Sequence, residues 1–233
     1  MNTILILHGW GSCAKRWENV KGLLEVQGYK VFVPDLPGFG QEPPPATAWS
    51  IDDYVEWVKK FSEKNNFSQF YLLGHSFGGG LAAKYASKYP ENIVKLFLVA
   101  SAIVRRKTFK KELFKKLAKI LNKFSVLPYY NLFRRAFYKI VLKSDYLSVE
   151  NAIMRETYLR VISEDLLSCL SGISAPSIII WGKKDEDTPL KDAYLIKEKI
   201  PGSRLEVLDN IGHDINSKAP EILAEKIIKF IND

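Results

Sequence analysis

A serine at position 76 lies in the sequence Gly74-His75-Ser76-Phe77-Gly78, between an apolar run and a helical pattern. Residues 70–73 are typical of a short buried strand, and residues 81–86 are typical of a helix. A serine on such a sharp turn projects its hydroxyl clear of the backbone, and the glycines let the helix pass close to the turn. We therefore interpret Ser76 as a candidate nucleophile. The alternative is an ordinary glycine-rich turn, whereas a phosphate-binding loop is disfavoured because no lysine directly follows the glycines.

The candidate base comes from the three histidines of the chain. A serine hydroxyl is a weak nucleophile at neutral pH, so it needs a base within hydrogen-bonding reach. His75 lies inside the turn, and His8 lies in the loop after the first expected strand. His213 follows the last expected strand, at the sheet edge where Ser76 also lies and where open parallel sheets bind ligands. We therefore expect His213 to be the base.

The base in turn needs an orienting acid, for which the loop after residues 177–181 offers several carboxylates. Asp185 lies four residues beyond Trp181, where this expected strand ends on the same sheet edge. Asp187 is the alternative, and we expect Glu186 to face away. No cluster of His, Cys and carboxylate residues has metal-ligand spacing, and a serine activated by a base and an acid requires neither a metal nor an organic cofactor.

Several motifs together resemble the α/β-hydrolase superfamily. They are His8-Gly9-Trp10-Gly11, residues 35–40, residues 74–79, residues 181–185 with Pro189, and Gly212-His213. The loops at 8–11 and 35–40 resemble the pimeloyl-ACP methyl ester esterases most. The resemblance covers nearly the whole chain outside a central insertion.

The resemblance implies a mechanism and a set of residues. In chain order it implies Ser76 as nucleophile, Asp185 as acid and His213 as base. The backbone N–H groups of Trp10 and Phe77 would form the oxyanion hole, where each donor can contribute about 3 kcal/mol to transition-state stabilisation. The implied activity is that of a serine carboxylesterase that hydrolyses small to medium acyl esters through an acyl-enzyme intermediate.

Two aromatic residues in loops, Phe39 and Trp49, are candidate walls of the substrate pocket. Other activities stay open. A lactonase or a carbon–carbon bond hydrolase would use the same triad, and a ligand-binding protein could keep the triad without turnover.

The elements expected around these residues form an α/β fold with a mostly parallel sheet of about six strands. The first two strands of the usual fold would be missing, which would leave residues 29–33 at one edge of the sheet. The expected strands are 3–7, 29–33, 70–73, 94–100, 177–181 and 204–208. The expected helices include 12–27 with Ser12 as N-cap, 50–65 with a near capping box of Ser50 and Asp53, 190–199 and 219–231.

Residues 103–171 interrupt the alternation of strands and helices and are predicted to form a helical cap, or lid, inserted into a core of residues 1–102 and 172–233. The formal charge is 34 − 26 = +8, but residues 105–143 alone carry thirteen Lys or Arg and one acid, Glu112, or +12. This stretch could be a solvated lid, dock an acidic carrier protein, or attach to an anionic membrane surface. Nucleic acid is disfavoured because no recognition motif accompanies the charge.

The compartment expected from the sequence is the cytoplasm. No apolar run of 18 residues and no signal-type N-terminus is visible. The two cysteines, Cys13 and Cys169, are far apart in sequence and are expected to be reduced thiols without a catalytic role.

Overall fold

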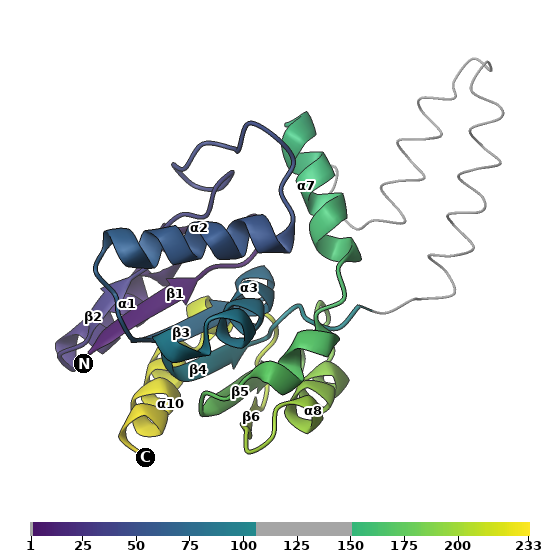
Figure 1. The fold of residues 1–233 in the computed structure, drawn as a ribbon. Coiled ribbons are helices and arrows are strands. Elements are labelled where there is room, and N and C mark those ends of the chain that lie inside the picture. The colour runs from purple at the N-terminus through teal and green to yellow at the C-terminus, as the bar shows by residue number, and fades with distance from the viewer. Residues whose placement is uncertain (1, 106–150) are drawn as a thin grey trace.

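Six parallel strands form the central sheet of the computed structural model, which describes residues 2–105 and 151–233 (Figure 1). The strands are β1 (Thr3–Leu7), β2 (Lys30–Phe32), β3 (Phe70–His75), β4 (Ile93–Val99), β5 (Ser177–Gly182) and β6 (Arg204–Leu208). Their spatial order is β2-β1-β3-β4-β5-β6, and every neighbouring pair is parallel. The expected sheet is therefore confirmed, with β2 at an edge.

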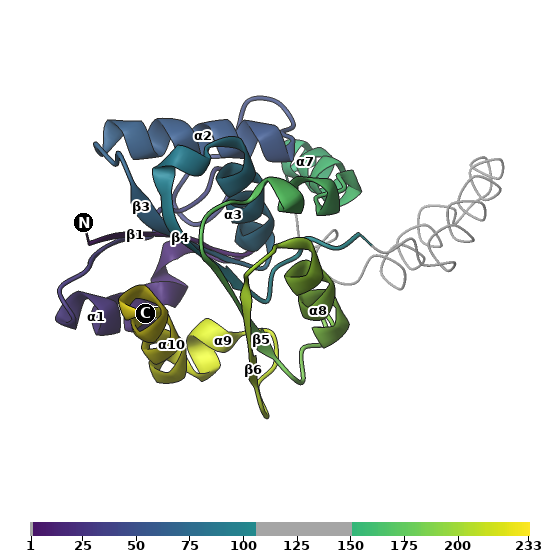
Figure 2. The same cartoon turned by 60° about the horizontal axis from the view of Figure 1, so that its bottom comes forward.

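Helices cover both faces of this sheet (Figure 2). One face carries α2 (Ile51–Lys64), α3 (Phe77–Lys88) and α8 (Leu190–Lys199), and the other carries α1 (Glu18–Val26), α9 (Ile215–Lys218) and α10 (Pro220–Asn232). Alternate residues of each strand enter one core or the other: Leu5 and Leu7 pack with α2 and α3, whereas Ile4 and Ile6 pack with α1 and α10. Both faces are buried at the centre of the sheet, so inner strands such as β1 and β5 are almost continuously apolar.

The helix expected over residues 12–27 begins differently from the prediction. A 3-10 turn (Ala14–Trp17) precedes α1. The N-cap residue of this 3-10 turn is Cys13 rather than Ser12. A carboxylate from a distant loop replaces the capping hydroxyl, because Ala14 N–H donates to Asp35 Oδ1 at 2.6 Å. The N-cap prediction for Ser12 was wrong for this reason.

The start of α2 confirms the predicted capping box. Ser50 N–H donates to Asp53 Oδ2 at 2.8 Å, and Asp53 N–H donates to Ser50 Oγ at 3.3 Å. Two backbone donors that the helix itself cannot satisfy are thereby paired. In contrast, α9 was not predicted, because a four-residue helix is too short to show a periodic pattern.

Between β4 and β5 the described residues form α7 (Ala152–Ser163) and a 3-10 helix, η3 (Leu167–Gly172). Helix α7 stands beside the N-terminal end of α2, apart from the sheet (Figure 1).

Most of the predicted cap, and all of the basic stretch except Arg105, lie outside the described residues. The domain boundaries therefore stay predictions, and so does the binding of the basic stretch to an acidic carrier protein or to an anionic membrane surface. Binding to anionic vesicles that does not weaken with added salt would contradict an electrostatic attachment.

The turn at Ser76 is packed so closely that two of its glycine positions have no room for a side chain. A Cβ atom added to Gly78 would lie 2.1 Å from the backbone oxygen of Leu7, and one added to Gly74 would lie 2.2 Å from the backbone oxygen of Gly78. Both clashes are with backbone atoms, which cannot rotate away. The expectation that the helix passes close to the turn is confirmed.

We predict that Gly78→Ala lowers the free energy of unfolding by about 1–3 kcal/mol or more, because the new methyl group must displace the backbone of β1. Gly22→Ala is the matched control. Gly22 lies within α1, and apart from its chain neighbours and the backbone of its own helix no atom lies within 4 Å of its added Cβ. That variant should be more stable than the wild type by about 0.5–1 kcal/mol. Urea unfolding measures both, and a Gly78→Ala protein as stable as the wild type would contradict the packing described.

Candidate active site

Ser76 occupies a strained backbone conformation between β3 and α3. Its φ of 53° and ψ of −116° are unusual for a residue with a side chain. Hydrogen bonds hold this conformation: Ser76 N–H donates to Val99 O at 3.0 Å, and Ser76 O accepts from Ala102 N–H at 2.8 Å. The side chain stays partly exposed, although its neighbours His75 and Phe77 are buried. Strain of this kind persists only where the surrounding structure imposes it.

His213 and Asp185 meet across the loops that follow β6 and β5. His213 Nδ1 lies 2.8 Å from Asp185 Oδ2. The Asp185 side chain is fully buried, and the His213 side chain is 17% exposed. A proton on Nδ1 that is donated to the carboxylate leaves the lone pair of Nε2 available as the base.

The Asp185 carboxylate has further donors that the sequence analysis missed. The backbone N–H groups of Asp187 and Thr188 donate to Oδ1 at 2.9 and 2.8 Å. Thr188 Oγ1 donates to Oδ2 at 2.7 Å. Asp187, the alternative acid in the sequence analysis, thus contributes its backbone to the carboxylate of Asp185.

The electrostatics of the pair favour a charged acid and a basic histidine. Burial lowers the pKa of His213, but the hydrogen bond to Asp185 and the charges of Asp185, Asp187 and Asp214 together raise that pKa above 6.5. Burial raises the pKa of Asp185, but the hydrogen bonds from His213 and Thr188 bring it below the usual value. Asp185 is therefore ionised near neutral pH.

The other two histidines are bound to the backbone. His75 Nε2 donates to the backbone oxygen of His213 at 3.0 Å. Burial, and then the charge of His213, lower the pKa of His75 to about 4, so His75 is neutral at pH 7. The hydrogen bond from His75 connects the turn of Ser76 to the loop that carries His213.

His8 holds the loop that contains Trp10. Leu36 N–H donates to His8 Nε2 at 2.9 Å, so the ring proton lies on Nδ1 and is donated to Gly9 O at 2.8 Å. Burial lowers the pKa of His8, which favours this neutral form. The loop reaches the turn, because a Cβ added to Gly9 would lie 3.2 Å from Ser76 Cβ. The residues expected to donate to the oxyanion, Trp10 and Phe77, are therefore neighbours.

Aromatic rings surround this part of the site. Phe39 packs edge-on against Trp10 at 4.8 Å between ring centroids, and Trp10 packs against Phe77 at 5.3 Å. Tyr158 of α7 also packs against Trp10, at 5.1 Å between ring centroids. Of the two candidate pocket residues, Phe39 thus contacts both Trp10 and Phe77.

The second candidate pocket residue, Trp49, reaches the site through another ring. Trp49 packs on Tyr54 at 5.0 Å, and Tyr54 packs on Phe77 at 5.2 Å. The Trp49 side chain is partly buried in the core on this face of the sheet. Trp49 therefore supports Phe77 by way of Tyr54.

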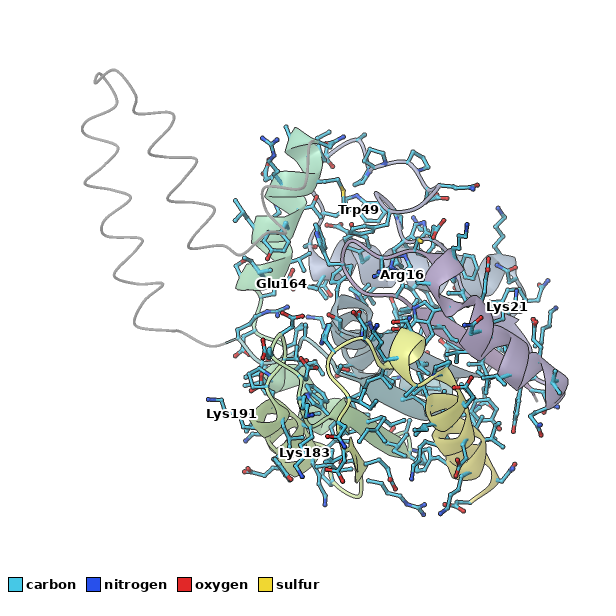
Figure 3. All side chains as sticks on the ribbon, turned by 180° about the vertical axis from the view of Figure 1, so that it is seen from behind. Arg16, Lys21, Trp49, Glu164, Lys183 and Lys191 are labelled. Atoms are coloured by element: carbon cyan, nitrogen blue, oxygen red, sulfur yellow. The ribbon has the colours of Figure 1, made fainter. Side chains whose placement is uncertain are left out.

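Helix α7 is attached to the segment that leads into α2. Trp49 N–H donates to Thr157 Oγ1 at 3.0 Å, and Ile51 N–H donates to Glu164 Oε1 at 2.7 Å. Arg160 donates to the backbone oxygen of Ala48 at 2.8 Å. Figure 3 labels Trp49 and Glu164 at this junction. These polar contacts fix the helix that carries Tyr158 over the aromatic rings.

Within residues 2–105 and 151–233, no group of His, Cys, Asp and Glu is arranged to hold a metal ion. None of the helices in this described part of the chain is long and apolar enough to cross a membrane. Cys13 and Cys169 are both free thiols.

We predict that the His213 imidazole titrates above pH 6.5 in the wild type and below 6.5 in Asp185→Asn. The substitution removes the charge and hydrogen bond that raise the His213 pKa, so desolvation by burial should then dominate. Two-dimensional NMR of the histidine rings measures both values. Unchanged titration of His213 in Asp185→Asn would contradict the pairing.

Comparisons with known proteins bear on the fold and the family of the chain. A solved meta-cleavage product hydrolase from Pseudomonas fluorescens superposes with a TM-score of 0.74 at 20% identity, over 100% of this chain and 91% of that one. At that identity the likeness concerns the fold alone.

Curated relatives match over most of the sequence. Monoacylglycerol lipase ABHD6 of Bos taurus is 28% identical over 98% of this chain and 75% of its own length. Lipase 1 of Psychrobacter immobilis is 25% identical over 90% of this chain and 70% of its own length. The sequence profile described as the alpha/beta hydrolase fold matches residues 2–123, which is more than half of the chain. The chain therefore belongs to the α/β-hydrolase superfamily.

Proposed function

We propose that the chain is a serine carboxylesterase in which Ser76 is the nucleophile, His213 the base and Asp185 the acid. The observation that carries this proposal is the 2.8 Å contact between His213 Nδ1 and a buried Asp185 carboxylate, on the sheet edge where Ser76 occupies its strained turn. The names of the relatives, monoacylglycerol lipase and lipase, support ester hydrolysis as the reaction class.

The proposed reaction proceeds in two halves. Ser76 Oγ forms a bond to the ester carbonyl carbon, and its proton moves to His213 Nε2. The backbone N–H groups of Trp10 and Phe77 donate to the oxyanion. The C–O bond of the ester then breaks, and the alcohol leaves with the proton from His213. Water attacks the acyl-enzyme, gives its proton to His213, and the acid is released as Ser76 Oγ regains that proton.

The expected acyl group is small to medium in length. The rings of Trp10, Phe39, Phe77 and Tyr158 pack against one another, and Met154 of α7 packs onto Gly38. Apolar side chains in mutual contact fill space that a long acyl chain would need. The same rings give an acyl group an apolar surface and exclude water from the acyl-enzyme.

A lactonase or carbon–carbon bond hydrolase would use the same three residues, and no described residue favours either over the ester. A ligand-binding protein differs from an enzyme by the absence of turnover. The pair of His213 and Asp185 supports an enzyme, because binding alone does not require an imidazole that is polarised by a buried carboxylate.

We predict that the protein hydrolyses p-nitrophenyl esters with an optimum between acetate and octanoate, and that Ser76→Ala reduces kcat on the order of 10⁴-fold or more. The value of kcat/KM should fall as pH decreases through the raised pKa of His213, because the protonated imidazole cannot accept the serine proton.

The matched control is Ser68→Ala, since Ser68 is exposed next to the opposite end of β3. This variant should keep wild-type activity. An optimum at palmitate would contradict the expected acyl length, and turnover retained by Ser76→Ala would contradict the proposed nucleophile.

A further inference from the structure

The hydroxyl group of Thr188 lies at the meeting point of three loops. Its Oγ1 atom is 2.7 Å from Asp185 Oδ2, 3.3 Å from His213 Nδ1 and 3.2 Å from the backbone oxygen of Ala100. The residue is buried. Its backbone is held as well, because Trp181 Nε1 donates to Thr188 O at 2.7 Å. The side chain is therefore fixed beside the acid and the base of the proposed triad.

The chemistry of the neighbours determines how this hydroxyl is used. A hydroxyl has one proton to donate, whereas the ionised Asp185 carboxylate and the Ala100 carbonyl can only accept. The contact with Asp185 is the shorter one, and a bond to a charged acceptor is the stronger kind. The hydroxyl proton is therefore directed to Oδ2, the same oxygen that lies against His213 Nδ1.

We infer that Thr188 is a positioning residue for the reaction proposed above, on which this inference rests: its hydroxyl holds the Asp185 carboxylate so that Oδ2 faces His213. The two backbone donors reach only Oδ1. The hydroxyl is the donor that fixes Oδ2 and so prevents rotation of the carboxylate away from the imidazole.

Other charged or titratable groups also face His213. Asp187 and Asp214 are exposed and act on His213 through their charge, and His75 contacts it from the turn of Ser76. None of these groups is altered when the hydroxyl of Thr188 is removed. Thr188→Val keeps the shape and the methyl group, so this variant isolates the hydroxyl.

Loss of the hydroxyl should have two measurable effects. Without the hydroxyl the carboxylate can turn away from the imidazole, so part of the hydrogen bond and charge that raise the pKa of His213 is lost, and this pKa should fall by about one unit. The carboxylate is also less well oriented, so kcat should fall about tenfold with KM unchanged, which is the loss expected for one hydrogen bond to a charged group.

The first experiment is an NMR titration of His213 in the wild type, Thr188→Val and Thr188→Ser, which needs no turnover. Serine restores a hydroxyl and should return the titration to the wild-type value. The control is Thr3→Val, the same chemical change at the amino end of β1. A His213 titration unchanged in Thr188→Val, or shifted equally in Thr188→Ser, overturns the inference. If valine prevents folding, Thr188→Ala gives the same comparison.

The second experiment follows the pH dependence of kcat/KM for p-nitrophenyl butyrate with the same proteins. The acidic limb should move to lower pH in Thr188→Val and return to its wild-type position in Thr188→Ser. A lower kcat with an unmoved acidic limb overturns the inference, since damage to packing alone would produce it. If the wild type shows no turnover, the proposed function fails, whereas the NMR titration still decides the role of Thr188.

Discussion

The contact between His213 and Asp185 is the interaction on which the proposed chemistry depends. A buried carboxylate is costly unless it is paired, and Asp185 is paired with an imidazole, a hydroxyl and two backbone N–H groups. The sheet order makes this possible, because β5 and β6 are neighbours and both loops leave the same edge. The pair raises the pKa of one group and lowers that of the other, so that a base and a charged acid coexist near neutral pH.

Close packing fixes the position of Ser76, the proposed nucleophile. Helix α3 approaches β1 so closely that Gly78 has no room for a side chain, and Ser76, directly before this helix, has a positive φ. His75, next to Ser76, donates to the backbone of His213, and Gly9 lies against Ser76 from the loop fixed by His8. The strain at one residue is thus offset by many contacts around it, and the three loops are held in a common arrangement.

Much of this arrangement could be predicted from the sequence. Strands buried on both faces are continuously apolar, so β1 was predicted at 3–7 without error. The capping box of Ser50 and Asp53 is a local pattern and was predicted for the same reason. The order of the elements also indicated that Ser76, Asp185 and His213 would share one edge of the sheet, which limited the candidates to a few residues.

What could not be predicted depends on contacts between distant parts of the chain. Thr188 is an ordinary loop residue in the sequence, and only the fold brings its hydroxyl to Ala100 and His213. Asp35 replaces the predicted cap of the first helix across 21 positions, and Glu164 reaches Ile51 across 113. No local pattern records such contacts, because each depends on the path of the whole chain.

The central claim is that Ser76 is an activated nucleophile, and covalent labelling tests it most directly. The folded protein would be treated with a fluorophosphonate, digested, and analysed by peptide mass spectrometry, with heat-denatured protein as the control. Our account predicts a single adduct on the peptide that contains Ser76, and no adduct in the denatured sample, because activation requires His213 in its folded position. An adduct on another residue, or none in the folded protein, would contradict it.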